Sequence, residues 1–281
     1  MSSPDISAAS SSAARPETET APRTKRGSLL LAPGVLPGLT TLVILLAWEG
    51  ATRLFAIPSF VLPSPLGILA GFEAVGLSRW AEHIGATLRV AMLGYAVSIL
   101  VAVPLAIVLA RSPVLSRALY PILVVVQSTP IVAVAPIIIV VMGAGDLPRV
   151  VITCLITFFP IVVSTTTGLM ATPPELIELS KSLRAPAWRE ITQIRLPFAV
   201  PYIFSALKIS ITLAVIGAVV AEFVAAEKGV GYFIQFSTSM FRLPQAWAGL
   251  LILAGMSLLL FQAVTLIQKR VFPWSLPKDA P

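Results

Sequence analysis

Six apolar runs, each about as long as a membrane-spanning helix, dominate this chain of 281 residues. A helix needs roughly 20 residues to cross the ~30 Å hydrocarbon core of a bilayer. Backbone amides inside lipid must bond within their own segment, so the runs are expected to be helices and not strands. The runs cover residues 35–56, 86–110, 119–142, 149–170, 203–224 and 246–267. The sequence therefore predicts an all-α, polytopic membrane protein with six transmembrane helices.

Composition supports this class and excludes several others. Hydrophobic residues make up 57% of the chain and charged residues only 12%, whereas soluble domains carry roughly 25% charged residues. The net charge of +7 is scattered between the apolar runs and forms no basic patch, which argues against nucleic-acid binding. The single cysteine, Cys154, cannot form an intramolecular disulfide. No phosphate-binding, nucleophile-elbow or zinc-protease motif occurs in the sequence, and an enzyme is not expected.

The distribution of basic residues predicts the orientation, because Lys and Arg near span ends tend to remain cytoplasmic. With the N-terminus inside, thirteen of the 20 Lys and Arg residues fall on the cytoplasmic side and six on the other, with Lys208 inside the fifth span. Both termini and residues 172–197 are then cytoplasmic. The outer loops at 57–85, 143–148 and 225–245 are too short for a folded domain, so tight capture of a solute outside is expected of another polypeptide.

The termini differ from the membrane domain at 31–275. Residues 1–30 are rich in Ser, Ala, Pro and Thr, and such a segment cannot bury enough apolar surface to offset its ordering entropy. We expect a disordered cytoplasmic tail there and a short cytoplasmic tail at 276–281. A cleaved signal peptide is disfavoured because the first apolar run is long and lacks a cleavage site.

The third run contains Pro121, Pro130 and Pro136 and should be kinked.

A polar stretch interrupts the apolar pattern between the fourth and fifth runs, and reads ELIELSKSLRAPAWREITQIRLP at residues 175–197. Thr172 is the expected N-cap of a first short helix, with Glu175 placed for a capping box. Pro186 should end that helix and Pro197 should close a second one. Apolar side chains recur along one face of each helix, at Leu176, Leu179 and Leu183 and then at Trp188, Ile191 and Ile194. Two roles fit: an interfacial hairpin on the lipid headgroups, or a docking element for a cytoplasmic partner.

The spacing within this stretch resembles a known family signature. Glu178-Leu179-Ser180, three residues, Arg184, nine residues and Ile194-Arg195-Leu196-Pro197 are similar to the EAA loop of binding-protein-dependent ABC importer permeases, E-A-A-x3-G-x9-I-x-L-P. Glu178, Ile194, Leu196 and Pro197 match, whereas Leu179, Ser180 and Arg184 depart from Ala, Ala and Gly. The resemblance extends over about residues 55–275 and is closest to the nitrate, sulfonate and taurine type.

That resemblance implies an ATP-driven importer in which the 172–197 loop couples this chain to an ATP-hydrolysing subunit. The coupling residues would be Glu178, Leu179, Ser180, Leu183, Arg184, Ile194, Leu196 and Pro197. It also implies a bacterial inner membrane location, a homodimer, two cytoplasmic ATP-binding subunits and an extracytoplasmic substrate-binding protein. No cofactor is expected on this chain, since ATP and magnesium belong to the partner subunit. The implied solute is a small anion such as a sulfonate, taurine or nitrate, with a pyrimidine or flavin precursor as the alternative.

Four polar residues within the apolar runs are candidates for the translocation pathway. Gln127, Ser128 and Thr129 precede Pro130, where they would contact a solute or satisfy the kinked backbone. Glu222 would line the pathway, latch an outer gate, or pair with Lys228 or Arg89.

Arg184 would point to solvent or to acidic lipid beside a turn made by Ala185 and Pro186, or meet an acidic residue on the ATPase. An ATP-independent secondary transporter is the competing class, but the sequence shows no internal repeat.

Overall fold

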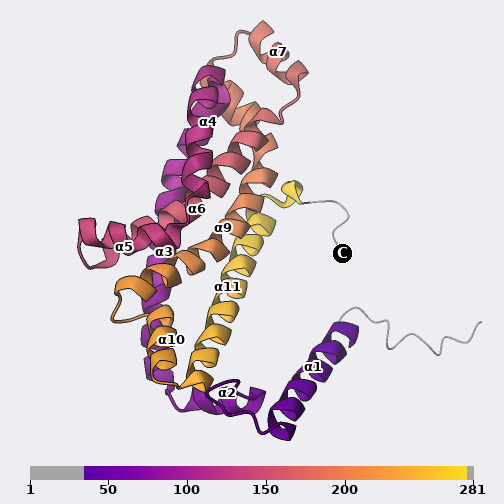
Figure 1. Cartoon of the computed structure of the whole chain (residues 1–281). Coiled ribbons are helices and arrows are strands. Elements are labelled where there is room, and N and C mark those ends of the chain that lie inside the picture. Colours follow the sequence, from indigo (N-terminus) through magenta and orange to yellow (C-terminus); the bar gives the residue numbers. More distant parts are fainter. Residues whose placement is uncertain (1–34, 277–281) are drawn as a thin grey trace, which may run out of the picture. The chain divides into compact units, whose positions relative to one another are not determined.

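The computed structural model describes residues 35–276, which contain helices and no strands. The predicted tail at 1–30 and residues 277–281 lie outside this range. The chain divides within α1 (Val35–Leu54) into two compact units, one ending at Ala47 and one beginning at Trp48. The second unit contains, in chain order, α2 (Pro65–Glu73), α3 (Leu77–Arg111), α4 (Pro113–Ser128), α5 (Ile131–Met142), α6 (Asp146–Met170), α7 (Pro174–Ser182), α8 (Ala187–Arg189), the π-helical turn η1 (Glu190–Arg195), α9 (Leu196–Ala225), α10 (Val230–Ser239), α11 (Leu243–Val271) and the 3-10 turn η2 (Pro273–Ser275) (Figure 1).

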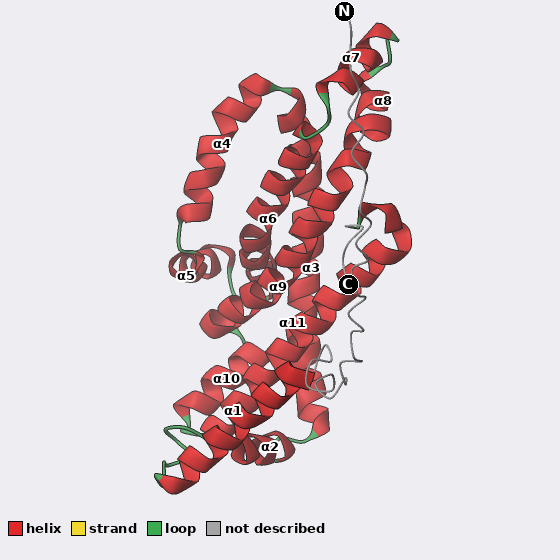
Figure 2. Ribbon diagram, turned by 90° about the vertical axis from the view of Figure 1, so that its right-hand side faces the viewer, coloured by secondary structure: helices red, strands yellow, loops and turns green. Residues whose placement is uncertain are grey.

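The prediction of an all-α membrane fold is confirmed. Five helical runs in the described residues are long and apolar enough to span a membrane: α1, α3, α6, α11 and the continuous run from α8 through α9. The predicted third span differs from a simple kinked helix, because α4 and α5 meet at an angle of 94° (Figure 2). Counting this bent pair as one span gives six. The break lies at Pro130, while Pro121 and Pro136 remain inside regular helix.

Backbone chemistry explains where the third span breaks. Pro130 has no N–H to donate to the carbonyl four residues earlier, and the N–H of Thr129 bonds to Val126 instead, at 3.2 Å. This shift leaves the Val125 carbonyl free, and the Thr129 hydroxyl donates to it at 3.0 Å. The Ser128 hydroxyl donates to Val124 in the same way, at 2.8 Å. Local side chains therefore satisfy the end of α4, as apolar surroundings require.

The core lies where α3, α6 and α9 pack side by side (Figure 1). Close approach depends on small residues: a Cβ added at Gly217 would lie 2.9 Å from the Cα of Thr153, and Gly94 is also packed against Thr153. Buried hydroxyls cross-link the same helices. Thr157 donates to Ser98 at 2.7 Å, and Ser98 donates to the carbonyl of Cys154 at 2.9 Å. The three helices thus form a tightly packed body.

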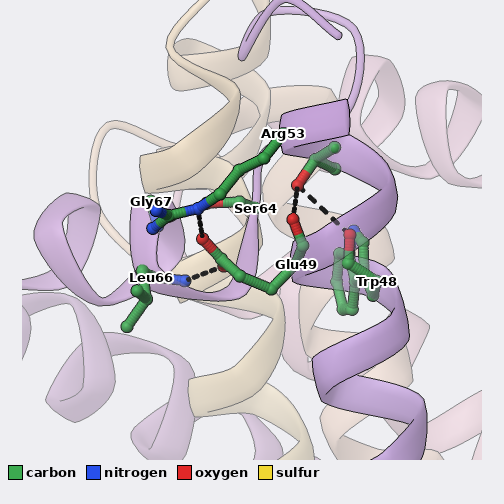
Figure 3. Close-up of polar contacts among 7 residues, drawn as sticks. Trp48, Glu49, Arg53, Ser64, Leu66 and Gly67 are labelled. Atoms are coloured by element: carbon green, nitrogen blue, oxygen red, sulfur yellow. Dashed lines mark hydrogen bonds and ion pairs between the residues drawn. The ribbon is translucent and has the colours of Figure 1, made fainter. Parts of the chain in front are cut away.

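The predicted outer loop at 57–85 contains α2 and the first turns of α3. Glu49 fixes the start of α2: one carboxylate oxygen accepts from the Leu66 N–H at 3.1 Å, and the other pairs with Arg53 at 2.6 Å (Figure 3). Ser64 is the N-cap of α2 and accepts from the Gly67 N–H at 3.1 Å. Both polar groups satisfy backbone donors that open the helix.

Candidate functional site

The 172–197 loop begins with a helix whose cap differs from the prediction. Helix α7 starts at Pro174, and its N-cap is Pro173. The Thr172 hydroxyl instead donates back to the Leu169 carbonyl at 3.2 Å, because Thr172 is buried against the end of α6. The predicted capping by Thr172 is therefore wrong. Its hydroxyl satisfies the preceding helix rather than the following one.

Helix α7 ends in a turn centred on Arg184. The helix stops at Ser182, and Arg184 has a φ of 51°, in the left-handed region. The N–H of Arg184 bonds to Lys181 at 2.9 Å, and the N–H of Ala185 bonds to Ser180 at 3.0 Å. These two bonds form a Schellman motif with Arg184 at the position that glycine usually occupies. The prediction that Ala185 and Pro186 form the turn is wrong, since Arg184 itself carries the left-handed backbone.

Three large apolar side chains are exposed on the loop. Leu179, Leu183 and Trp188 are 55%, 73% and 58% exposed, and Arg189 stacks over the Trp188 ring at 5.4 Å. Glu178 and Arg184 are also exposed. Ser180, in contrast, is only 3% exposed and turns inward. The loop surface thus combines an apolar patch (Leu179, Leu183 and Trp188) with charged neighbours, an arrangement suited to docking.

The second half of the loop runs into the membrane helix without interruption. Residues Glu190–Arg195 form a π-helical turn in which the N–H of Leu196 bonds to Ile191, five residues earlier. Pro197 then lies in the first turn of α9, where its missing N–H is tolerated. The prediction that Pro197 closes a second short helix is therefore wrong. Ile194, Leu196 and Pro197 are half-buried at this junction, and Glu190 pairs with Arg195 at 2.7 Å.

The break between α4 and α5 borders a cavity of about 260 Å³. Gln127 and Thr129 provide its polar side chains, and the remaining lining comes from Val126, Pro130, Ile131, Leu155, Ile156 and Leu213. Ser128 does not line it. Because the Ser128 and Thr129 hydroxyls donate to their own helix, Gln127 is the candidate with the freest hydrogen-bonding groups at this cavity.

Glu222 is held at the opposite end of α9 from the loop. Its side chain is 1% exposed, and its carboxylate accepts from the Thr87 hydroxyl and from the Gly231 N–H, each at 2.7 Å. Thr87 in turn accepts from the Val230 N–H at 2.8 Å. The His83 ring accepts from the Gly229 N–H at 3.2 Å. We call this group, formed by Glu222, Thr87, His83 and the backbone of Gly229–Gly231, the Glu222 clamp.

The partners predicted for Glu222 are engaged elsewhere. Lys228 pairs with Glu82 at 2.5 Å, and this hydrogen bond raises the pKa of Lys228. Arg89 pairs with Asp146 at 3.2 Å, and Asp146 also accepts from Arg149 at 3.4 Å. A pairing of Glu222 with Lys228 or Arg89 is therefore wrong. The sequence signal that was missed is Thr87, a polar residue inside an apolar run, opposite a Gly-Val-Gly segment.

The chain matches the family model described as "Binding-protein-dependent transport system inner membrane component" over residues 98–274, a range that includes both the loop and Glu222. It is 33% identical over 238 residues to the formylaminopyrimidine transport permease protein ThiX of Halalkalibacterium halodurans, covering 85% of this chain and 95% of that protein. It is also 33% identical over 260 residues to the riboflavin transport system permease protein RibX of Chloroflexus aurantiacus, covering 92% and 97%.

A lower identity, 26% over 241 residues, relates the chain to the taurine transport system permease protein TauC of Escherichia coli, covering 84% and 88%. Among solved structures, the inward-facing MetNI methionine ABC transporter has a chain with the same fold, at a TM-score of 0.62 and 20% identity, covering 71% of this chain and 98% of that chain. The matched range, the apolar helices and these permease relatives all indicate the same family. The chain belongs to the family of binding-protein-dependent transport system inner membrane components, and it is a permease subunit of an ABC importer.

Proposed function

We propose that this permease imports its solute with energy from separate ATP-hydrolysing subunits, and that the 172–197 loop is the contact through which they act. The observation that carries the proposal is the exposed apolar patch of Leu179, Leu183 and Trp188 on a loop whose other exposed side chains are mostly polar or charged. A soluble cleft that covers this patch gains the hydrophobic energy of three large side chains. The proposed coupling residues Glu178 and Arg184 are exposed on the same loop, and Ile194, Leu196 and Pro197 lie where the loop enters α9.

The complete importer requires further chains. Two copies of this permease would enclose a pathway around a twofold axis, and each copy would bind one ATP-binding subunit on the cytoplasmic side. Magnesium and ATP would bind to those subunits and not to this chain. A separate extracytoplasmic binding protein would deliver the solute. Positive charge near the span ends supports the orientation with the loop and both termini in the cytoplasm.

Replacement of Glu178 by Arg tests the docking contact. The variant chain is expected to lose the ATP-binding subunit during co-purification, because a reversed charge at a desolvated contact opposes binding. Glu175→Arg is the matched control, since Glu175 is an exposed acid on the same helix but outside the motif. The proposal fails if solute uptake by the wild-type protein persists without any ATP-binding subunit, because the chain would then act as a secondary transporter.

For the solute, we favour a small heterocycle such as a pyrimidine or flavin precursor. The cavity at the α4 and α5 break offers the Gln127 amide among apolar walls, and none of the described residues that line it is charged. Such a lining suits a neutral, planar solute with amide-type hydrogen-bonding groups. The two relatives at 33% identity, named for formylaminopyrimidine and riboflavin transport, support the same class.

A small anion, as the sequence first suggested, is the second candidate. One observation favours it: a cavity of about 590 Å³ near the end of α9 is lined by Arg89, Arg149 and Lys228, with Asp146 and Glu227 beside them. These cations are partly neutralised by the two carboxylates. The taurine permease relative, at 26% identity, lends the anion further support.

A ligand screen separates the two classes of solute. Thermal shift of the cognate binding protein with pyrimidines, riboflavin, taurine and nitrate identifies its ligand, and uptake into a deletion strain confirms it. Gln127→Leu should slow uptake of a heterocycle, whereas Ser128→Ala, at a hydroxyl bonded within its own helix, should not. Binding of taurine or nitrate alone would refute the heterocycle proposal.

A further inference from the structure

Helix α10 begins with three consecutive N–H groups that its own residues do not satisfy. His83 accepts from Gly229, Thr87 from Val230 and Glu222 from Gly231. The first N–H groups of a helix carry positive partial charge, which makes a carboxylate their best acceptor. Helix α10 is therefore capped by side chains from α3 and α9, and its start is tied to both helices.

The Glu222 carboxyl group packs tightly against the backbone of Gly229 and Gly231. A Cβ added at Gly229 would overlap the Glu222 carboxyl group, and one added at Gly231 would lie 2.8 Å from a carboxylate oxygen. Both carboxylate oxygens are bonded to donors of the protein, and the side chain is 1% exposed. A buried carboxylate is costly once its donors are removed. The clamp is consequently stable when closed and unfavourable when partly open.

Helix α9 joins this clamp to the loop at its other end. The helical run Ala187–Ala225 is continuous over 39 residues and includes the π-helical turn of the loop. At 1.5 Å per residue, the backbone of Arg195 and that of Glu222 are about 40 Å apart along one helix. The loop and Glu222 are therefore joined by one helical run, along which a displacement of the loop end can be carried.

We propose that Glu222 is a positioning residue for transport: it transmits the movement of α9 to α10 and α3, so that these three helices move together when the loop is displaced. The inference deepens the proposed function and rests on it, because the 172–197 loop is taken as the point where the ATP-binding subunits act. Glu222 has no free carboxylate oxygen for a solute, so its role is to hold the helices together rather than to bind cargo.

The test compares two buried threonines, each replaced by the isosteric valine. Thr87→Val removes the clamp hydroxyl, and Thr157→Val removes a hydroxyl of equal burial from the packed α3 and α6 interface. Each variant is reconstituted in proteoliposomes with the ATP-binding subunit that co-purifies with the wild-type chain and with the cognate binding protein. The readout is the amount of solute imported per ATP hydrolysed, which a loss of stability alone does not change.

Thr87→Val and Glu222→Ala are expected to reduce this ratio about tenfold or more while hydrolysis continues, since a charge-assisted hydrogen bond is worth at least that factor. Thr157→Val should lower thermal stability and leave the ratio unchanged, and Thr87→Ser should restore it. Amide exchange at Gly229–Gly231 should accelerate in Glu222→Ala, which reports the opened clamp directly.

An unchanged ratio in both clamp variants, with accelerated exchange, would overturn the inference and leave the proposed function standing. A wild-type chain that imports nothing in response to ATP would refute the proposed function and this inference together.

Discussion

Replacing Arg184 by Gly should strengthen the turn that ends α7. A non-glycine residue in the left-handed region costs about 1–2 kcal/mol, and Arg184 lies there at a φ of 51°. Glycine removes this cost but loses about 0.5–1 kcal/mol through its greater freedom in the unfolded chain. The two ranges leave a net stabilisation of the turn of about 0–1.5 kcal/mol, and the middle of that range, about 0.5–1 kcal/mol, corresponds to roughly a two- to fivefold shift in its opening equilibrium.

Hydrogen exchange measures this opening locally. The N–H groups of Arg184 and Ala185 bond to Lys181 and Ser180, so their exchange reports the Schellman motif itself. In Arg184→Gly their exchange should slow by the same factor of about two to five. Arg184→Ala is the control, because it removes the charge but keeps the Cβ that causes the strain. Equal exchange in the Gly and Ala variants would show that the backbone at Arg184 is not strained, and the reasoning would be wrong.

Two further predictions concern packing and the start of α2. Gly217→Ala should destabilise the chain by about 1–3 kcal/mol, because the added Cβ lies 2.9 Å from the backbone of Thr153; thermal unfolding in detergent checks this, with Gly255→Ala, where a Cβ meets no atom within 4 Å, as the tolerated control. Glu49→Gln should speed amide exchange at Leu66 by about threefold, because the neutral amide is a weaker acceptor than the carboxylate; no change there would mean that the contact is not maintained in solution.

The sequence predicted the type of fold well, because burial in lipid imposes one solution on an apolar run of about 20 residues. The Glu49 and Arg53 pair follows from their spacing, since residues four apart share a helix face. The break of 94° at Pro130 was harder to predict from the sequence, which indicated only a kink. A proline marks a weak point in a helix, but its position alone does not give the angle between the two segments, which also depends on what they pack against.

Long-range contacts account for most of the remaining differences. Glu222 and Thr87 are 135 residues apart, so no local pattern indicates that both accept from N–H groups at the start of α10. Thr172 is a comparable case on a smaller scale: its sequence context predicts an N-cap, but tertiary burial directs its hydroxyl to Leu169. A local propensity decides a structure only where no packed neighbour offers the same side chain a better partner.

Pro197 shows why the difference between a local sequence pattern and the observed structure matters for function. A proline at the end of a polar stretch predicts a helix end, and a helix end there would leave the 172–197 loop hinged to the membrane domain. The π-helical turn before it removes the need for that end, because its i to i+5 bonding brings Pro197 into the first turn of α9. A hinged loop would absorb a displacement, whereas a continuous helix carries it to the Glu222 clamp. The geometry of one turn thus decides whether movement at the loop can reach the other end of the permease.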